Sequence, residues 1–183
     1  MSRINVPTSI DTAPKGARPL LEAIKAKLGS VPNVFRLISN SPAALEGLRS
    51  LQGALDRGAL DPHTRERIAL AIANVNGGDY CNAAHTAIAK SLELDEREIE
   101  AARGGGSDNA KADAAVSFAR KVAVQRGDVT DTDLQHVRDA GYSDAELVEI
   151  VARVALSTFT NYVNEVFKTP IDFPVAAPTR RTS

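Results

Sequence analysis

The sequence predicts an all-α fold in a single domain. Apolar residues recur at helical spacing through most of the chain. Residues that cap helix N-termini stand before most of these segments, and no segment shows the sustained period-two alternation of a β-strand. A chain of 183 residues is long enough for a core of its own. We expect about seven to nine helices in residues 17–174, an extended N-terminal arm at residues 1–16 and a loose C-terminal tail at residues 175–183.

Each helix expected in the first half of the chain starts at a proline or a capping residue and has an apolar stripe. Proline suits the first turn of a helix because the N–H group that it lacks would be unbonded there. The expected starts are Pro19, Ser41 with Pro42, and Asp61 with Pro62. The first stripes are Leu21, Ile24 and Leu28, then Val34, Phe35 and Ile38 in a short segment, then Leu45, Leu48, Leu51 and Leu55.

The helix that begins at Asp61 continues through Glu66 into residues 68–73, which are apolar on every side of the helix. This pattern is typical of a helix buried among others. Glu66 therefore lies at the edge of a core, where a carboxylate needs a partner. The residues leave that partner open, and an ion pair with Arg65 or Arg67 is one interpretation.

Capping signals also mark the helices of the second half. Asp95 with Glu98, and Ser143 with Glu146, have the spacing of a capping box. Residues 104–107 are rich in glycine, and we interpret them as a flexible connection. No strand precedes them and no Lys-Ser/Thr pair follows, as a phosphate-binding loop would require. The other expected helix starts are Asp79, Asp108, and Thr130 with Asp133.

The last helix, expected at residues 143–167, is apolar around much of its circumference, so neighbouring elements must cover it. With 4% aromatic residues and no Trp, the chain has few large side chains for this purpose. We therefore expect other copies of the chain to supply part of the cover, in a homo-oligomer. The apolar residues are Leu147, Val148, Ile150, Val151, Val154, Leu156, Phe159, Val163 and Val166.

Composition and charge argue against several kinds of partner. The 22 basic and 23 acidic residues are spread along the chain and give a net charge of -1, so no global field attracts nucleic acid or a membrane surface. One cysteine cannot form an intrachain disulfide, and the first residues lack the features of a signal peptide. No apolar run approaches the roughly 20 residues that cross a bilayer. We expect a cytoplasmic protein.

Residues 66–86 read ERIALAIANVNGGDYCNAAHT and contain the only cysteine, Cys81, with His85 four residues later. On a helix these two side chains share one face, at the spacing of a nucleophile and its base. The glycine pair at 77–78 ends the preceding apolar run, and Asp79 can cap the next helix. Cys81 would then lie in the first turn, where the helix dipole favours the thiolate. The residues alone also allow a buried structural cysteine and an ordinary helix histidine.

This stretch resembles the alkyl hydroperoxidase D (AhpD) family, within the carboxymuconolactone decarboxylase-like superfamily. The core of that family reads Glu, then eleven residues, then C-x-Y-C-x-x-A-H-T or a close variant. Glu66, Cys81 and His85 stand at the family's spacing. Gly78 takes the place of the family's first cysteine, and Tyr80 stands where a histidine is often found.

The resemblance spans most of residues 17–174. Its C-terminal end, TPIDFP at residues 169–174, looks like the terminus of the peroxidase-related branch of the superfamily. The resemblance implies the helical AhpD-like fold and assembly into trimers or hexamers. It implies no cofactor and no metal.

The resemblance also implies a thiol-dependent alkyl hydroperoxidase, with an antioxidant role. Cys81, His85 and Glu66 would be catalytic: His85, oriented by Glu66, takes the proton of Cys81, and the thiolate reduces a hydroperoxide. Tyr80 and Gly78 would be supporting positions. Because no cysteine stands at position 78, a thiol from outside the chain must reduce the oxidised Cys81.

Two other functions stay open. Similarity to the lactone decarboxylases of the superfamily would imply a lyase with His85 or Glu66 as the acid or base, and Cys81 would then be dispensable. The loss of the dithiol at Gly78 would also suit a helical oligomer that has kept the fold without catalysis.

Overall fold

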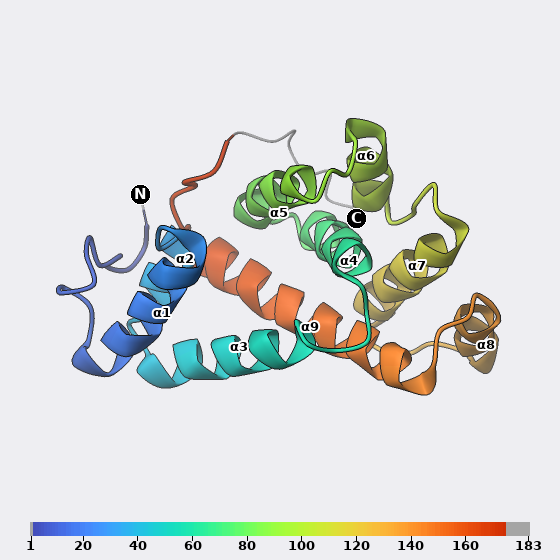
Figure 1. The fold of residues 1–183 in the computed structure, drawn as a ribbon, viewed down its shortest axis with the longest axis horizontal. Coiled ribbons are helices and arrows are strands. Elements are labelled where there is room, and N and C mark those ends of the chain that lie inside the picture. The colour runs from blue at the N-terminus through green and yellow to red at the C-terminus, as the bar shows by residue number, and fades with distance from the viewer. Residues whose placement is uncertain (1, 175–183) are drawn as a thin grey trace.

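The computed structural model describes residues 2–174, and these form nine α-helices and no β-strand (Figure 1). The predicted all-α class is therefore confirmed for the described residues, whereas the expected tail at 175–183 lies outside them. A single 3-10 turn, Lys15–Ala17, precedes the first helix. The helices are α1 (Arg18–Leu28), α2 (Asn33–Ile38), α3 (Pro42–Leu55), α4 (Pro62–Val75), α5 (Asp79–Ser91), α6 (Glu96–Gly104), α7 (Ala110–Gln125), α8 (Asp131–Asp139) and α9 (Asp144–Phe167).

Two helices hold the fold together. α9 runs diagonally through the molecule, with α1 and α2 at one end and α7 and α8 at the other (Figure 1). α4 packs against α5, α6, α7 and α9. Residues 68–73 of α4 are buried on every side, as their composition predicts. Because α5 packs on both α4 and α9, its motif residues face the middle of the molecule.

The predicted helix starts are confirmed wherever a side chain bonds the backbone three residues later. At Ser143 the capping box is complete, since Glu146 also accepts from the Ser143 backbone. At Asp95 only half of the box forms, because the Glu98 carboxylate turns away to bind Arg67, Ser107 and the Asp108 backbone. The predicted residues whose side chains form such caps are Ser41, Asp61, Asp95, Thr130 and Ser143.

Two expected starts are wrong by one residue. The N-cap of α5 is Gly78, with φ -88°, and Asp79 is the first helical residue. Asp79 thus places its carboxylate beside the positive end of the helix without capping it. The N-cap of α7 is Asn109, because the Asp108 carboxylate pairs with Arg97 instead.

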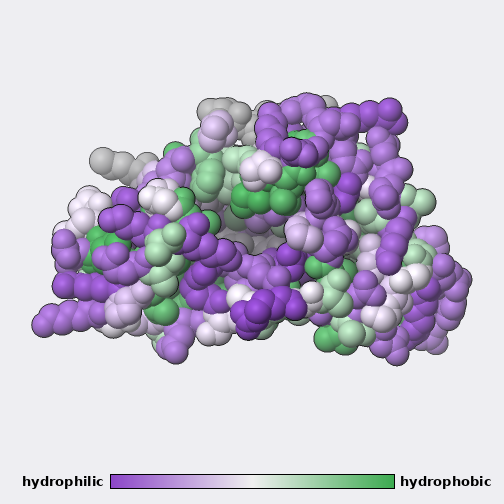
Figure 2. Space-filling model, in the orientation of Figure 1, coloured by the Kyte–Doolittle hydropathy of each residue, from purple (hydrophilic) through white to green (hydrophobic). Residues whose placement is uncertain are grey.

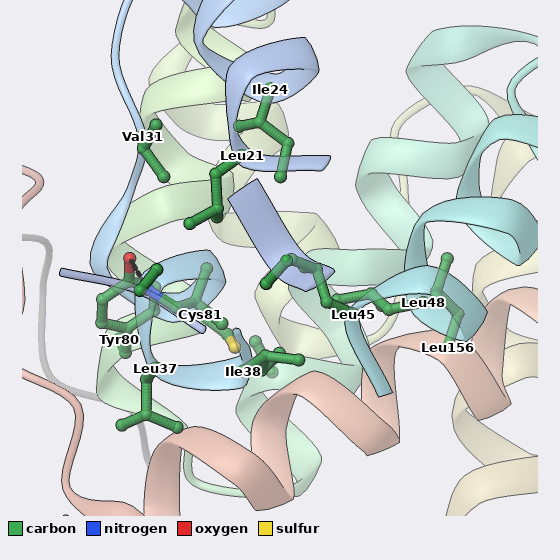
Figure 3. Packing of buried hydrophobic residues seen from close by; sticks show 14 residues of the cluster. Leu21, Ile24, Val31, Leu37, Ile38, Leu45, Leu48, Tyr80, Cys81 and Leu156 are labelled. Atoms are coloured by element: carbon green, nitrogen blue, oxygen red, sulfur yellow. Dashed lines mark hydrogen bonds between the residues drawn. The ribbon is translucent and has the colours of Figure 1, made fainter. Parts of the chain in front are cut away.

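The site end of the molecule is built on one of the hydrophobic clusters. Residues of α1, α2 and α3 pack there against Tyr80 and Cys81 of α5 and Leu156 of α9 (Figure 3). Cys81 is therefore part of a core as well as of a motif. No helix within residues 2–174 is both long and apolar enough to span a membrane.

Among residues 2–174, no segment covers one face of α9. Its apolar side chains lie three, four or eight residues apart along the helix and are exposed, up to 70% for Val148 and 58% for Tyr162. This exposed apolar face agrees with the expectation that neighbouring helices leave part of α9 uncovered. The exposed apolar residues of α9 are Val148, Val151, Phe159, Tyr162 and Val166.

Candidate functional site

A cavity of about 340 Å³ lies between α5 and α9, and α1, α2, α3 and Phe173 complete its walls. Figure 2 shows a hollow on this face between α5 and α3, with hydrophobic residues of α5 along its upper edge. Most of the lining is apolar, as in ordinary small-molecule sites. Its polar residues are Ser30, Gln52, Tyr80, Cys81, His85, Arg153, Ser157, Thr160 and Asn164.

A second, more open hollow of about 500 Å³ is lined mainly by polar and charged side chains, among them Asp61, Arg67 and Lys111. Its lining includes none of Glu66, Cys81 and His85. We therefore locate the candidate site in the apolar cavity, where the only thiol of the chain and His85 meet.

Cys81 lies in the first turn of α5, as predicted, and is only 3% exposed. Its sulfur points towards α9 (Figure 3). There the side-chain amide of Asn164 donates to Sγ at 3.2 Å. Burial raises the pKa of the Cys81 thiol, while Asn164, Asn161 and Thr160 oppose this shift by favouring the thiolate.

The expectation that the helix terminus favours the thiolate of Cys81 is therefore wrong for this structure. The N-terminal position is real, but the sulfur faces a packed core instead of solvent. Loss of water destabilises the thiolate more than the hydrogen bonds from Asn164, Asn161 and Thr160 stabilise it. Cys81 consequently needs a base to react at neutral pH.

Glu66 and His85 are in contact across α4 and α5, with 2.7 Å between Oε1 and Nδ1. The partner of Glu66 is thus neither Arg65 nor Arg67. Arg67 pairs with Glu98, and Arg65 donates to a backbone carbonyl of α3. Both members of the Glu66–His85 pair are largely buried, which strengthens the interaction.

This contact determines which nitrogen of His85 can react. When Nδ1–H donates to Glu66, Nε2 is left as the basic nitrogen. The carboxylate also stabilises the imidazolium that forms when Nε2 takes a proton. Within residues 2–174 the imidazole makes no other hydrogen bond, so Nε2 can serve a ligand in the cavity.

Cys81 and His85 line the same cavity from successive turns of α5. Among the described residues no hydrogen bond joins the thiol to the imidazole, because Sγ is directed to Asn164. A proton that passes between them must therefore travel through a molecule bound in the cavity.

Tyr80 supports the wall of the cavity and does not present a free hydroxyl. Its OH donates to Asp172 at 2.8 Å and accepts from the Val34 backbone at 3.1 Å. Its ring meets Phe173 edge-on, at 5.7 Å between centroids. Burial raises the pKa of Tyr80. The residue thus ties α2 and the C-terminal segment to the start of α5.

Gly78 has an ordinary negative φ, whereas the left-handed conformation is found at Gly77, with φ 65°. A Cβ atom added at Gly78 would lie 3.6 Å from the Asn161 side chain, which is ordinary van der Waals contact. Position 78 can therefore accept a side chain.

Sequence reasoning missed the residues that α9 contributes, above all Asn164 and Arg153. A signal for them exists, because polar residues interrupt an otherwise apolar helix at the spacing of a single face. The residues with this spacing are Arg153, Ser157, Thr160 and Asn164. Among the described residues, no group of three or more His, Cys, Asp or Glu side chains is arranged to hold a metal ion.

Residues 42–125, from α3 to α7, match the profile of the Carboxymuconolactone decarboxylase family. That range includes Glu66, Cys81 and His85. None of the curated protein sequences with which the chain was compared matches it significantly.

Solved structures share the fold along almost the whole chain. An AhpD-core, peroxidase-related protein from Ralstonia eutropha JMP134 is 26% identical, with a TM-score of 0.83 over 93% of this chain and 92% of that one. A peroxidase-related protein from Silicibacter sp. TM1040 is 23% identical, with a TM-score of 0.80 over 92% and 91% of the two chains.

A third similar structure is the debrominase Bmp8, in a complex with 2,3,4-tribromopyrrole. It is 22% identical, with a TM-score of 0.77 over 94% of each chain. These likenesses confirm the fold, and the debrominase indicates that the chemistry performed on this fold varies.

Proposed function

Since the chain belongs to the AhpD and carboxymuconolactone decarboxylase-like superfamily, we propose that it is a thiol-dependent peroxidase that reduces an organic hydroperoxide. The observation that supports this most directly is the shared cavity: the Cys81 thiol and the imidazole of the Glu66–His85 pair line one largely apolar space. A nucleophile and a positioned base are the two groups that the reaction needs.

In the first step the hydroperoxide lies between Sγ and His85 Nε2. The thiol proton passes to Nε2 through the bound molecule, and the thiolate attacks the terminal oxygen of the peroxide. An S–O bond forms as the O–O bond breaks, and the leaving alkoxide takes the proton from the imidazolium. Cys81 becomes a sulfenic acid and the hydroperoxide becomes an alcohol.

The base is needed because burial holds the pKa of Cys81 above its ordinary value. Even an unperturbed thiol is only a few per cent ionised at neutral pH. General base catalysis is worth about 10²- to 10⁴-fold in rate. Glu66 contributes by fixing the imidazole and by stabilising its charged form.

The second step returns Cys81 to the thiol. One external thiol attacks the sulfenic sulfur and releases water, and a second thiol then displaces Cys81 and leaves as a disulfide. Gly78 offers no internal thiol for this step. Because Sγ is buried beneath α9, a small thiol reaches it more easily than a protein does.

The proposal is tested by the response of Cys81 to peroxide. A mild dose of an organic hydroperoxide should add one oxygen atom to the folded protein, measured by intact mass, and a sulfenate trap should capture the product at Cys81. A thiol that stays unmodified in the folded protein while the denatured control is oxidised would exclude the peroxidase function.

A second candidate is acid–base catalysis in which the thiol takes no part, as in a decarboxylase-like lyase. It is favoured by one observation. Sγ is hydrogen-bonded to Asn164, whereas the hydrogen bond between Glu66 and His85 forms without any contribution from Cys81. This function requires His85 and tolerates the loss of Cys81. A non-catalytic oligomer would tolerate the loss of both.

We also infer that the protein is a homo-oligomer through the exposed face of α9, with a trimer or hexamer as the expected form. The exposed apolar side chains of this face lie three, four or eight residues apart, so they share one side of the helix, as in helix–helix contacts. Analytical sedimentation should give a species several times heavier than the 19.4 kDa monomer, and Tyr162→Glu should dissociate it. Val124→Glu, at an exposed apolar residue of α7, is the matched control and should not. A stable monomer at micromolar concentration would refute this inference.

A further inference from the structure

Arg153 is a buried cation whose hydrogen bonds are incomplete. The residue is 8% exposed and lines the cavity from α9. Within the described residues its Nε has no hydrogen-bond partner, and Nη2 reaches Asp56 at 3.3 Å. Asp56 is itself shared with Lys27, 3.6 Å away. A guanidinium with five donors is therefore held by one long contact to a carboxylate that also serves a second cation.

Such an arrangement is costly without a further partner. Burial lowers the pKa of Arg153, Asp56 and Glu66 oppose this shift only in part, and Arg65 adds to it. Buried charges in proteins are normally paired and fully hydrogen-bonded. Because Arg153 lines the cavity, an anion bound there would give the guanidinium a partner of opposite charge, in the geometry that guanidinium and carboxylate groups prefer.

The position of Arg153 indicates how such an anion would lie relative to the reacting groups. Arg153 and Asn164 share one face of α9 and are eleven residues apart, which is about 16 Å along a helix. Asn164, at the C-terminal end of this face, contacts the Cys81 sulfur. Cys81 is thus at one end of the cavity and Arg153 is towards the other.

The space between the two ends is mainly apolar. Its walls there include Phe35 of α2, Leu48 of α3, Ile88 of α5 and Leu156 of α9. A ligand that fits both ends has an anionic head and an apolar body, with its reactive group at the far end from the charge. Burial of that body provides affinity, and the charged end provides orientation.

We propose that Arg153 is a specificity-determining residue that binds a carboxylate on the substrate, so that the preferred substrates are apolar carboxylic acids. The identity of the reacting group, a hydroperoxide at the Cys81 end, rests on the proposed function. The recognition of the carboxylate does not, since it depends only on Arg153 and the shape of the cavity.

The test compares two ligands that differ only in charge. Octanoate and octanamide are titrated into the full-length protein at neutral pH by calorimetry. Octanoate should bind roughly 10- to 100-fold more tightly, as expected for a buried hydrogen bond to a charged partner. Arg153→Gln should reduce this preference to about onefold, and Arg97→Gln, at an exposed arginine of α6, should leave it unchanged.

Two milder variants keep the test valid if Arg153→Gln does not fold. Arg153→Lys retains the charge without the planar fork and should keep a smaller preference for octanoate. Asp56→Asn removes the competing carboxylate and should tighten octanoate binding without changing octanamide binding. Equal affinity of the wild-type protein for the two ligands, or an octanoate preference that survives Arg153→Gln, would overturn the proposal.

The outcome is separable from that of the peroxidase test. His85→Ala should slow peroxide chemistry at neutral pH and still prefer octanoate, because His85 does not bind the carboxylate in this proposal. A protein that prefers octanoate but whose Cys81 resists peroxide would retain the Arg153 site and lose the proposed function.

Discussion

Cys81→Ser is expected to abolish hydroperoxide reduction, and His85→Ala is expected to slow the oxidation of Cys81 by about 10²- to 10⁴-fold. A serine hydroxyl cannot form the sulfenic acid on which turnover depends. Removal of the imidazole leaves a thiol whose pKa is raised by burial and which has no base in the cavity to ionise it. Stopped-flow consumption of a hydroperoxide by reduced protein measures both rates.

The pH dependence adds a readout that a purely structural defect would not change. Without His85, the reaction depends on ionisation of Cys81 itself, so its rate should rise steeply in the alkaline range, above the ordinary pKa of a thiol. The wild-type protein should react at neutral pH and show a weaker rise. His136→Ala, at an exposed histidine of α8, is the matched control and should behave as wild type.

The same pair of variants separates the two candidate activities. If Cys81→Ser retained a lactone-opening or decarboxylating activity that His85→Ala lost, the protein would be a lyase and the thiol would be dispensable. If neither substitution reduced any measurable activity, the non-catalytic oligomer would be favoured.

Gly78→Cys is expected to give the chain an internal resolving thiol. The introduced side chain would stand three residues before Cys81, at the spacing of dithiol redox motifs. The Cβ position at Gly78 adjoins Asn161, whose amide also interacts with the Cys81 thiol, so the two sulfur atoms are expected on the same side of α5. Peroxide should convert Cys81 to the sulfenic acid, and the new thiol should displace water to form an intrachain disulfide.

The backbone should tolerate this change, because Gly78 has φ -88°. Gly77→Cys is the control: its φ of 65° is strained for a side chain, and the substitution should cost about 1 kcal/mol or more in stability without forming the disulfide. Thiol counting and peptide mapping after peroxide treatment measure the outcome. Two free thiols in folded, peroxide-treated Gly78→Cys would show that position 78 does not face Cys81.

The helices of this protein, and the helix face that Cys81 and His85 share, follow from local sequence patterns. Ser41, Asp61 and Ser143 cap their helices through hydrogen bonds to residues only three positions ahead. Such local interactions can be identified from spacing alone. The i, i+4 relation of Cys81 and His85 follows from the helical period in the same way.

The partners and the environment of these residues depend instead on how the helices pack. His85 is 19 residues from Glu66, and Asn164 is 83 residues from Cys81, so helix packing selects those contacts. The same packing buries Cys81 and reverses the expected direction of its pKa shift. It also brings Arg153 into the cavity. Desolvation depends on everything that surrounds a group, and for that reason a local pattern predicts the position of the thiol but not its reactivity.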